Sequence, residues 1–221
     1  MKTGSRHTSC RPRRAGFRSA ALLAPLLLAG CSSLLGGGTS HSAIYAPDVR
    51  VADTQGWPQV RWRLAMGRTS GIRIADSQRI MVRPTPNELQ VYKDAQWAKS
   101  PGDMLEDSVL HALEDSGRIA VVARQGSGFG ADYRLMLDIR RFESDYAGTA
   151  LPSATIEVTA KLLHVKDQQL AGSHTFRQAR PAATTAVPDV VAAFDEALAA
   201  VTGELAGWTL TTGEQYERAR R

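Results

Sequence analysis

The chain has 221 residues, a length typical of one domain with or without tails. Its hydrophobic fraction of 43% is sufficient for a buried core, and its formal charge of +5 would favour nucleic acid or anionic lipid as a partner. The location of the charges excludes that interpretation. Residues 1–30 contain six Lys or Arg and no acidic residue, so residues 31–221 carry 21 basic and 22 acidic residues, a net charge of −1. We therefore expect no nucleic-acid partner.

The first thirty residues predict an export signal. A basic segment precedes an apolar run at 20–30, which matches a secretory signal and is shorter than the roughly 20 residues that span a bilayer. Leu28-Ala29-Gly30-Cys31 has the pattern of a lipobox, in which small residues let the extended chain enter a signal peptidase. Cleavage is expected between Gly30 and Cys31. The Cys31 thiol would then carry a diacylglyceryl group, and the new N-terminus an acyl chain such as palmitate. The alternative is an ordinary signal peptide, or a buried apolar helix, with a cysteine there by chance.

The mature N-terminus is predicted to be a lipid anchor on a tether. Residues 1–30 form the signal peptide and residues 31–43 the lipidated cysteine and a flexible segment rich in Ser and Gly. A coil of this length reaches about 15–20 Å, at roughly 5–6 Å times the square root of the residue number. Ser32 stands where an inner-membrane retention signal would usually have Asp. The periplasmic face of the outer membrane is therefore expected, in preference to the inner membrane.

Cysteine usage restricts the chemistry of the body. Cys10 lies in the leader and Cys31 at its end, so residues 32–221 contain no cysteine. A disulfide, a thiolate metal site and a cysteine nucleophile are thereby excluded from this part of the chain.

The first half of the body predicts short strands followed by a helix. Apolar and polar residues alternate over 60–64, and two further apolar runs at 80–82 and 89–91 flank a turn at 84–87. A helix is predicted to follow. Ser100 can cap it, Pro101 occupies its first position and Gly117 ends it.

The second half predicts longer strands and a second helix. Residues 133–139 and 156–162 alternate with a period of two, and a turn at 166–169 returns the chain through His174 and Phe176. The helix begins near Pro188 and carries an apolar stripe. A coiled-coil seam is the less favoured interpretation of that stripe, because two heptads are too few. The stripe consists of Val191, Phe194, Leu198, Val201 and Leu205.

These elements predict an α+β fold, with a mixed or antiparallel sheet of about five to seven strands and two helices packed on one face. The domain is expected to span 44–210, and 211–221 to form a polar, frayed C-terminal tail.

No group of residues indicates catalysis, a metal or a cofactor. The glycine-rich loop at 126–130 precedes a strand, whereas a dinucleotide loop opens a helix. His164 and His174 could approach each other, but two histidines make a poor metal site. The acidic residues Glu106, Asp107, Glu114 and Asp115 are interpreted as a solvated helix face, with paired catalytic carboxylates as the alternative. The four tryptophans are interpreted as packing residues, with a stacking surface for sugars or lipids as the alternative. They are Trp57, Trp62, Trp97 and Trp208.

The order of several segments resembles a known family. These segments are Arg79–Arg83, Leu89–Tyr92, Gln96–Ala98 before Pro101, His111–Arg118, Ala131–Leu135, Arg141–Glu143 and the alanine-rich C-terminal helix. Their order and spacing, together with the lipobox, resemble the ABC-type transport auxiliary lipoproteins over roughly 60–208, and the PqiC-like members most. Residues 68–76, rich in Gly and Arg, depart from the pattern.

The resemblance implies a non-catalytic, membrane-anchored periplasmic lipoprotein that works with an Mce-type transport system. The implied partners are an Mce-domain protein and the ABC permease and ATPase, and the substrate would be phospholipid or another hydrophobic molecule. A homo-oligomer is plausible by analogy alone. Only Cys31 transfers as a functional position. Two alternatives stay open: a lipoprotein that itself binds a hydrophobic ligand or an envelope glycan, and an assembly factor for an outer-membrane complex.

Overall fold

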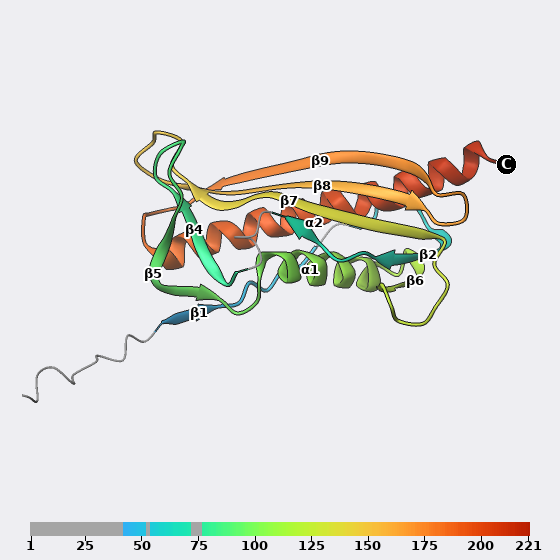
Figure 1. The fold of residues 1–221 in the computed structure, drawn as a ribbon, viewed down its shortest axis with the longest axis horizontal. Coiled ribbons are helices and arrows are strands. Elements are labelled where there is room, and N and C mark those ends of the chain that lie inside the picture. The colour runs from blue at the N-terminus through green and yellow to red at the C-terminus, as the bar shows by residue number, and fades with distance from the viewer. Residues whose placement is uncertain (1–41, 52–53, 72–76) are drawn as a thin grey trace, which may run out of the picture. The chain divides into compact units, whose positions relative to one another are not determined.

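The structure, a computed structural model, describes residues 42–51, 54–71 and 77–221, which we call the body. Its elements, in chain order, are β1 (Ala43–Tyr45), β2 (Val60–Met66), β3 (Ser70–Gly71), β4 (Arg79–Arg83), β5 (Gln90–Trp97), α1 (Pro101–Ser116), β6 (Ile119–Arg124), β7 (Tyr133–Asp145), β8 (Ser153–His164), β9 (Gln169–Pro181) and α2 (Val187–Ala219). The predicted α+β class is confirmed: a mixed sheet carries two helices (Figure 1). Two of its nine strands, β1 and β3, have only three and two residues.

β7 is the strand around which the sheet is built. It pairs antiparallel with β8 from Tyr133↔His164 to Asp145↔Ser153, and β8 pairs antiparallel with β9. The other edge of β7 is shared by β2, β3 and β4, all parallel to it. A 13-residue strand is long enough to hold three shorter strands end to end. β5 pairs with β4, and β1 adds to the outer edge of β5.

α1 begins and ends where its capping signals predict. The Asp103 backbone N–H donates to the Ser100 hydroxyl at 3.2 Å, and Pro101 occupies the first turn, where its missing N–H costs no hydrogen bond. Gly117 adopts φ +60°, and its N–H donates to the Glu114 carbonyl. A residue with a Cβ is strained at that angle, so glycine stops the helix there.

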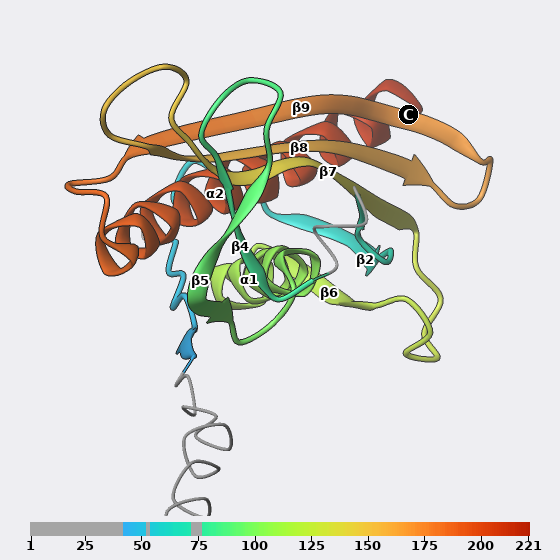
Figure 2. The same ribbon diagram turned by 60° about the vertical axis from the view of Figure 1, so that its left-hand side comes forward.

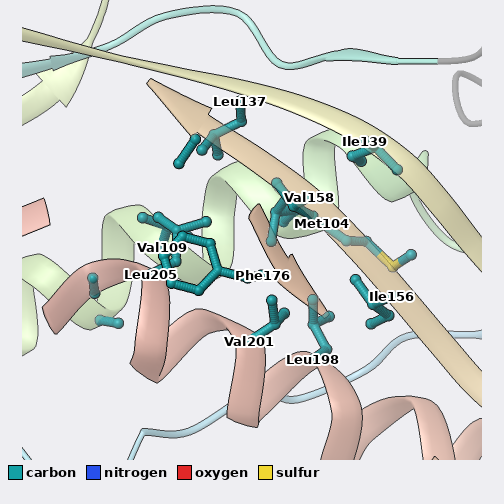
Figure 3. Packing of buried hydrophobic residues seen from close by; sticks show 14 of the residues in the cluster. Met104, Val109, Leu137, Ile139, Ile156, Val158, Phe176, Leu198, Val201 and Leu205 are labelled. Atoms are coloured by element: carbon teal, nitrogen blue, oxygen red, sulfur yellow. The ribbon is translucent and has the colours of Figure 1, made fainter. Parts of the chain in front are cut away.

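The core lies between the sheet and the two helices, which contact each other (Figures 1 and 3). The second helix buries the whole predicted stripe against β7, β8 and β9, so packing on the sheet is the correct interpretation. Figure 3 shows how side chains from five elements meet: Leu137 and Ile139 of β7, Ile156 and Val158 of β8, Phe176 of β9, Met104 and Val109 of α1, and Leu198, Val201 and Leu205 of α2.

The predicted polar tail is the main correction. α2 does not end near residue 210 but continues to Ala219. Its last turns are held to the strands by polar contacts: the Tyr133 hydroxyl donates to Glu217 Oε1 at 2.8 Å, and the Tyr216 hydroxyl donates to Asp167 Oδ2 at 3.2 Å. Arg220 also pairs with Asp167. The polar residues at 211–219, which we predicted to be frayed, are helical because their partners lie on β7 and on the β8–β9 turn.

Three strands were not predicted. β6 is short and lies at the sheet edge beside β2, and β1 and β3 are too short to show a period of two. Residues 72–76 of the divergent Gly- and Arg-rich segment lie outside the described residues. No helix in the described part of the chain is both long and apolar enough to cross a bilayer.

Candidate functional site

The predicted lipidation site cannot be placed in the fold. Gly30 and Cys31 lie outside the described residues, as does most of the 31–43 tether. The chain enters the body at Ser42 and immediately forms β1, whose partner β5 fixes it by the pairs Ala43↔Ala95 and Tyr45↔Trp97. Any anchor on Cys31 is therefore connected to the body at the outer edge of β5.

His164 and His174 do not form a site together. The His164 ring packs on Tyr133 and Tyr216, with its Nδ1 2.7 Å from Asp167 Oδ1, whereas His174 packs on Phe176 and Trp208. Among the described residues no group of three or more His, Cys, Asp or Glu is placed to hold a metal ion.

Asp167 is a hydrogen-bond acceptor for several groups. Removal from water alone would raise the pKa of its carboxyl, but hydrogen bonds from His164, the Gln169 backbone, Arg220 and Tyr216 hold that pKa well below its usual range. The arrangement fastens the end of α2 to the β8–β9 turn. It is structural, because each group already has a partner within the fold.

The acidic face of α1 forms ion pairs. Arg124 of β6 bridges Glu106, at 3.1 Å, and Asp107, and Lys99 lies 2.7 Å from Asp107. Glu114 and Asp115 are exposed. The predicted solvated face thus describes Glu114 and Asp115, whereas Glu106 and Asp107 are partly buried beneath Arg124.

Three of the four tryptophans pack on α2 and the fourth belongs to that helix, and together they do not form a stacking surface. Trp97 is fully buried and meets Phe194 edge-on, with ring centroids 5.2 Å apart. Trp57 and Trp62 lie against glycines of the helix: a Cβ at Gly207 would come within 2.6 Å of Trp57, and one at Gly213 within 2.5 Å of Trp62. Trp208, on α2 itself, packs on Phe176. The packing interpretation is correct, and the loop at 126–130 is likewise an inter-strand connection between β6 and β7.

The hollows on the described surface have both charged and apolar side chains in their walls. One of about 870 Å³ opens between the β2–β3 turn and the start of α1, with Arg68, Asp103, Glu106 and Arg124 in its wall. Two of about 270 Å³ flank His111 on α1, and their walls include charged residues too. Small-molecule pockets of this size are usually lined mainly by apolar side chains. The hollow lined by Val49, Met104 and Leu198 has a largely apolar wall, so it leaves the alternative of a hydrophobic ligand open.

A buried ion-pair cluster was not predicted. Glu143 of β7 is 1% exposed, and its carboxylate accepts from Arg83 Nε at 2.8 Å, Arg83 Nη2 at 2.9 Å and Arg141 Nε at 2.6 Å. Arg141 also donates to Asp145 at 2.6 Å. The hydrogen bonds with Glu143 raise the pKa of Arg83. The sequence feature that could have revealed this cluster is the run Arg140-Arg-Phe-Glu-Ser-Asp145. Four charged residues in six are unusual for a strand that is mostly buried.

This cluster joins β4 to β7. Backbone pairing between the two strands is limited to Val82↔Ser144 and Arg83↔Asp145. The Tyr92 hydroxyl of β5 adds a contact at 3.0 Å to the Ser144 hydroxyl. The Arg83–Glu143–Arg141–Asp145 network therefore positions the β4–β5 hairpin and the loop after β7.

Asp195 offers a test of the electrostatics at the start of α2. Its Oδ1 is buried and has no hydrogen-bond partner among the described residues, and burial together with the nearby Asp48 carboxylate raises its pKa. Because the folded-state pKa lies above the unfolded value, this group favours folding at low pH, and that contribution is lost as pH rises through the raised pKa. Asp195→Asn should therefore increase the free energy of unfolding at pH 7 by about 1 kcal/mol, as expected when an unfavourable buried charge is removed.

Urea denaturation at pH 7 and pH 3 measures this effect. The increase in the free energy of unfolding should be smaller at pH 3, because there the Asp195 carboxyl is largely protonated in both the folded and the unfolded state. Glu196→Gln, at the exposed neighbouring position, is the matched control and should change nothing. A loss of stability in Asp195→Asn at pH 7 would contradict the assigned sign.

Comparison with known proteins agrees with this fold. A family model described as "ABC-type transport auxiliary lipoprotein component" matches residues 44–206. The chain belongs to this family. The family is that of the auxiliary lipoprotein components of ABC-type transport systems.

Individual relatives support the assignment. A crystal structure of a Xanthomonas campestris protein of the DUF330 family is 57% identical, covers 80% of this chain and 99% of its own, and has a TM-score of 0.76. A second crystal structure, of an uncharacterized protein, shares the fold at 13% identity and a TM-score of 0.56, covering 74% of this chain and 95% of its own. An uncharacterized protein of Bradyrhizobium diazoefficiens is 28% identical over 193 residues, 83% of this chain. The chain spans about half the length of that curated relative, 49%.

Proposed function

We propose that this lipoprotein is the accessory of an Mce-type ABC transporter, anchored through Cys31 at the periplasmic face of the outer membrane. It docks an Mce-domain protein and helps phospholipid or another hydrophobic substrate pass between the membranes. The permease and ATPase of the same system are its further partners. Assembly into a homo-oligomer stays a prediction.

The family match over residues 44–206 is the observation that carries this proposal. The lipobox at 28–31 and the net charge of −1 for residues 31–221 support it from the sequence.

Binding to the Mce protein encoded beside this gene tests the proposal. Residues 32–221, tagged at the C-terminus, should retain that Mce protein in a pull-down. An Mce protein of a second system from the same cell is the matched control and should not be retained. Absence of such a neighbouring gene, or equal retention of both Mce proteins, would count against the proposal.

A further inference from the structure

β9 has a free edge along its whole length. It pairs antiparallel with β8 from His164↔Gln169 to Ser153↔Pro181, and no strand in the described part of the chain pairs with its other side. Figures 1 and 2 both show β9 on the outer side of β8. With 13 residues β9 is as long as β7, which holds three shorter strands end to end. The free edge is therefore long enough for an added strand.

One hydrogen bond shows which residues of β9 face the free edge. The Ala182 N–H, directly after β9, donates to the Pro152 carbonyl at 2.9 Å, and these two residues continue the register of Ser153↔Pro181. Opposite residues of an antiparallel pair alternate between hydrogen-bonded and non-hydrogen-bonded pairs, so the even-numbered residues at 172–180 direct their N–H and C=O groups to β8. The odd-numbered residues direct these groups to the free edge. They are Ser173, Thr175, Arg177, Ala179 and Pro181, which has no N–H.

The fold leaves this edge open to solvent. The edge-directed residues at 173, 175, 177 and 179 are all exposed. α2 packs on one face of β9, where Trp208 meets Phe176, and does not cover the edge. A long uncovered edge is a template for a further strand, and natural proteins usually shorten, bend or cover such edges. An extended polypeptide supplies donors and acceptors at the spacing of the edge, so it is the class of ligand that fits.

The sheet and the helices carry opposite charge. α1 and α2 hold eleven acidic residues and one basic residue, whereas the nine strands hold twelve basic and five acidic residues. β9 contributes Arg177 and Arg180 and has no acidic residue. Exposed charges separated by more than about 8 Å are largely screened at physiological ionic strength, so the acidic helices on one face do little to neutralise the other face of the sheet. The net charge of −1 for residues 31–221 conceals this separation.

Basic side chains lie beside the free edge on the face away from α2. Arg177 belongs to that face, and the exposed Lys161 of β8 is opposite Ser173. Glu157, opposite Arg177, is also 4.0 Å from Arg140, so one carboxylate lies among two guanidinium groups. Because opposite charges on neighbouring strands stabilise their pairing, acidic side chains on this face of an added strand are favoured.

The face towards α2 is aromatic at the same edge. The exposed His174 ring has its centroid 4.6 Å from that of Phe176 and 6.3 Å from that of Trp208. An added strand would place every second side chain beside these rings, because successive side chains point to opposite faces. Apolar side chains are favoured there, since they would bury apolar surface against the rings.

We propose that the free edge of β9 binds an extended segment of a partner protein as an added strand, with acidic side chains on the outer face and apolar side chains on the face towards α2. A second copy of β9 does not fit this description. Joining two copies would put four arginines and no acidic residue on neighbouring strands, and like charges there are destabilising. The inference rests on the edge and its charge, and it is independent of the Mce-type assignment.

Three synthetic peptides test the proposal on the mature, lipidated protein in detergent. Glu and Val alternate in the acidic peptide, Lys replaces Glu in the basic peptide, and the third is the acidic peptide N-methylated along its backbone. Each peptide carries a fluorophore, and anisotropy measures its binding. The acidic peptide should bind. The basic peptide, which repels Arg177, and the N-methylated peptide, which lacks backbone donors, should each bind at least about tenfold more weakly.

Variants of β9 locate the binding. Thr175→Pro removes an edge-directed N–H and leaves the bonds with β8 in place, and proline is tolerated at such edge positions. It should weaken binding of the acidic peptide about tenfold, whereas Thr175→Ala, which keeps the N–H, should not. Arg177→Gln should weaken binding about two- to fivefold. Lys93→Gln on β5 is the matched control for the loss of one positive charge and should change nothing. Circular dichroism checks that each variant is folded.

Several outcomes would overturn the proposal. They are no binding of the acidic peptide at millimolar concentration, equal binding of the acidic and basic peptides, and equal effects of Arg177→Gln and Lys93→Gln. An oligomer of the unmodified protein that Thr175→Pro dissociates, but Thr175→Ala does not, would show in sedimentation velocity that a second copy occupies the edge. That result would also overturn the proposal of an acidic partner.

Discussion

Replacing Cys31 by serine should move the exported protein from the membrane fraction to the soluble periplasmic fraction and leave its fold unchanged. A serine hydroxyl cannot form the thioether that holds the diacylglyceryl group. Each buried methylene of an acyl chain contributes about 0.8 kcal/mol, so one chain binds marginally and two or three bind almost permanently. Losing all of them removes the largest single interaction with the membrane that we predict for this protein. Cell fractionation, with the mass of the mature N-terminus, measures the change.

The other cysteine supplies the control. Cys10 lies in the basic leader, so Cys10→Ser should leave both the localisation and the mass of the mature protein as they are. A precursor that keeps its leader could stay in the inner membrane, so the serine variant is also made behind a leader cut by the general signal peptidase. If that processed variant still sediments with the membranes, the prediction of a lipid anchor on Cys31 is wrong.

Glu143→Ala should cost about 3–5 kcal/mol of the free energy of unfolding, the range for removing one partner of a buried ion pair. The change leaves the guanidinium groups of Arg83 and Arg141, each 24% exposed, without the carboxylate that accepts from both. Glu143→Gln keeps one acceptor oxygen and should cost less, about 1–3 kcal/mol. Urea denaturation measures the free energy of unfolding of both variants. The difference between the two gives the cost of losing the remaining acceptor group of the side chain.

A second glutamate on the neighbouring strand gives the comparison. Glu157 of β8 meets Arg140, which is half exposed, only at 4.0 Å, so Glu157→Ala should cost no more than about 1 kcal/mol. Because the cluster joins β4 to β7, hydrogen exchange should also quicken in residues 84–89 and 146–152 of the Glu143 variants. A cost for Glu143→Ala no larger than that for Glu157→Ala would show that the cluster does not stabilise the fold.

Prediction from the sequence succeeded where the signal was local. Ser100, Pro101 and Gly117 define α1 through backbone groups within a few residues of each helix end, and the structure has that helix within those bounds. The apolar stripe of α2 repeats over several turns, so its buried face could be assigned without knowledge of the partner strands. The alternation in β7 and β8 likewise predicted which side of the sheet is covered.

Prediction failed where stability comes from distant partners. Residues 211–219 look like a frayed tail because Glu217, Tyr216 and their neighbours are polar, yet Tyr133 and Asp167, far away in the sequence, hold them in the helix. β6 gives too short an apolar run to be separated from a loop, and it exists because β2 pairs with it. Such partners are brought together only by folding.

The sequence by itself determined the net charge of −1 for residues 31–221 and the α+β class with its two helices, and it predicts the export signal with its lipobox, since these depend on composition and on spacing along the chain. Only the tertiary structure decided the rest. It separated His164 from His174, packed Trp57, Trp62 and Trp97 against α2 and buried Glu143 between two arginines. The reason is physical: these features are juxtapositions across a sheet of nine strands, where pairing and register, not sequence separation, set which residues meet.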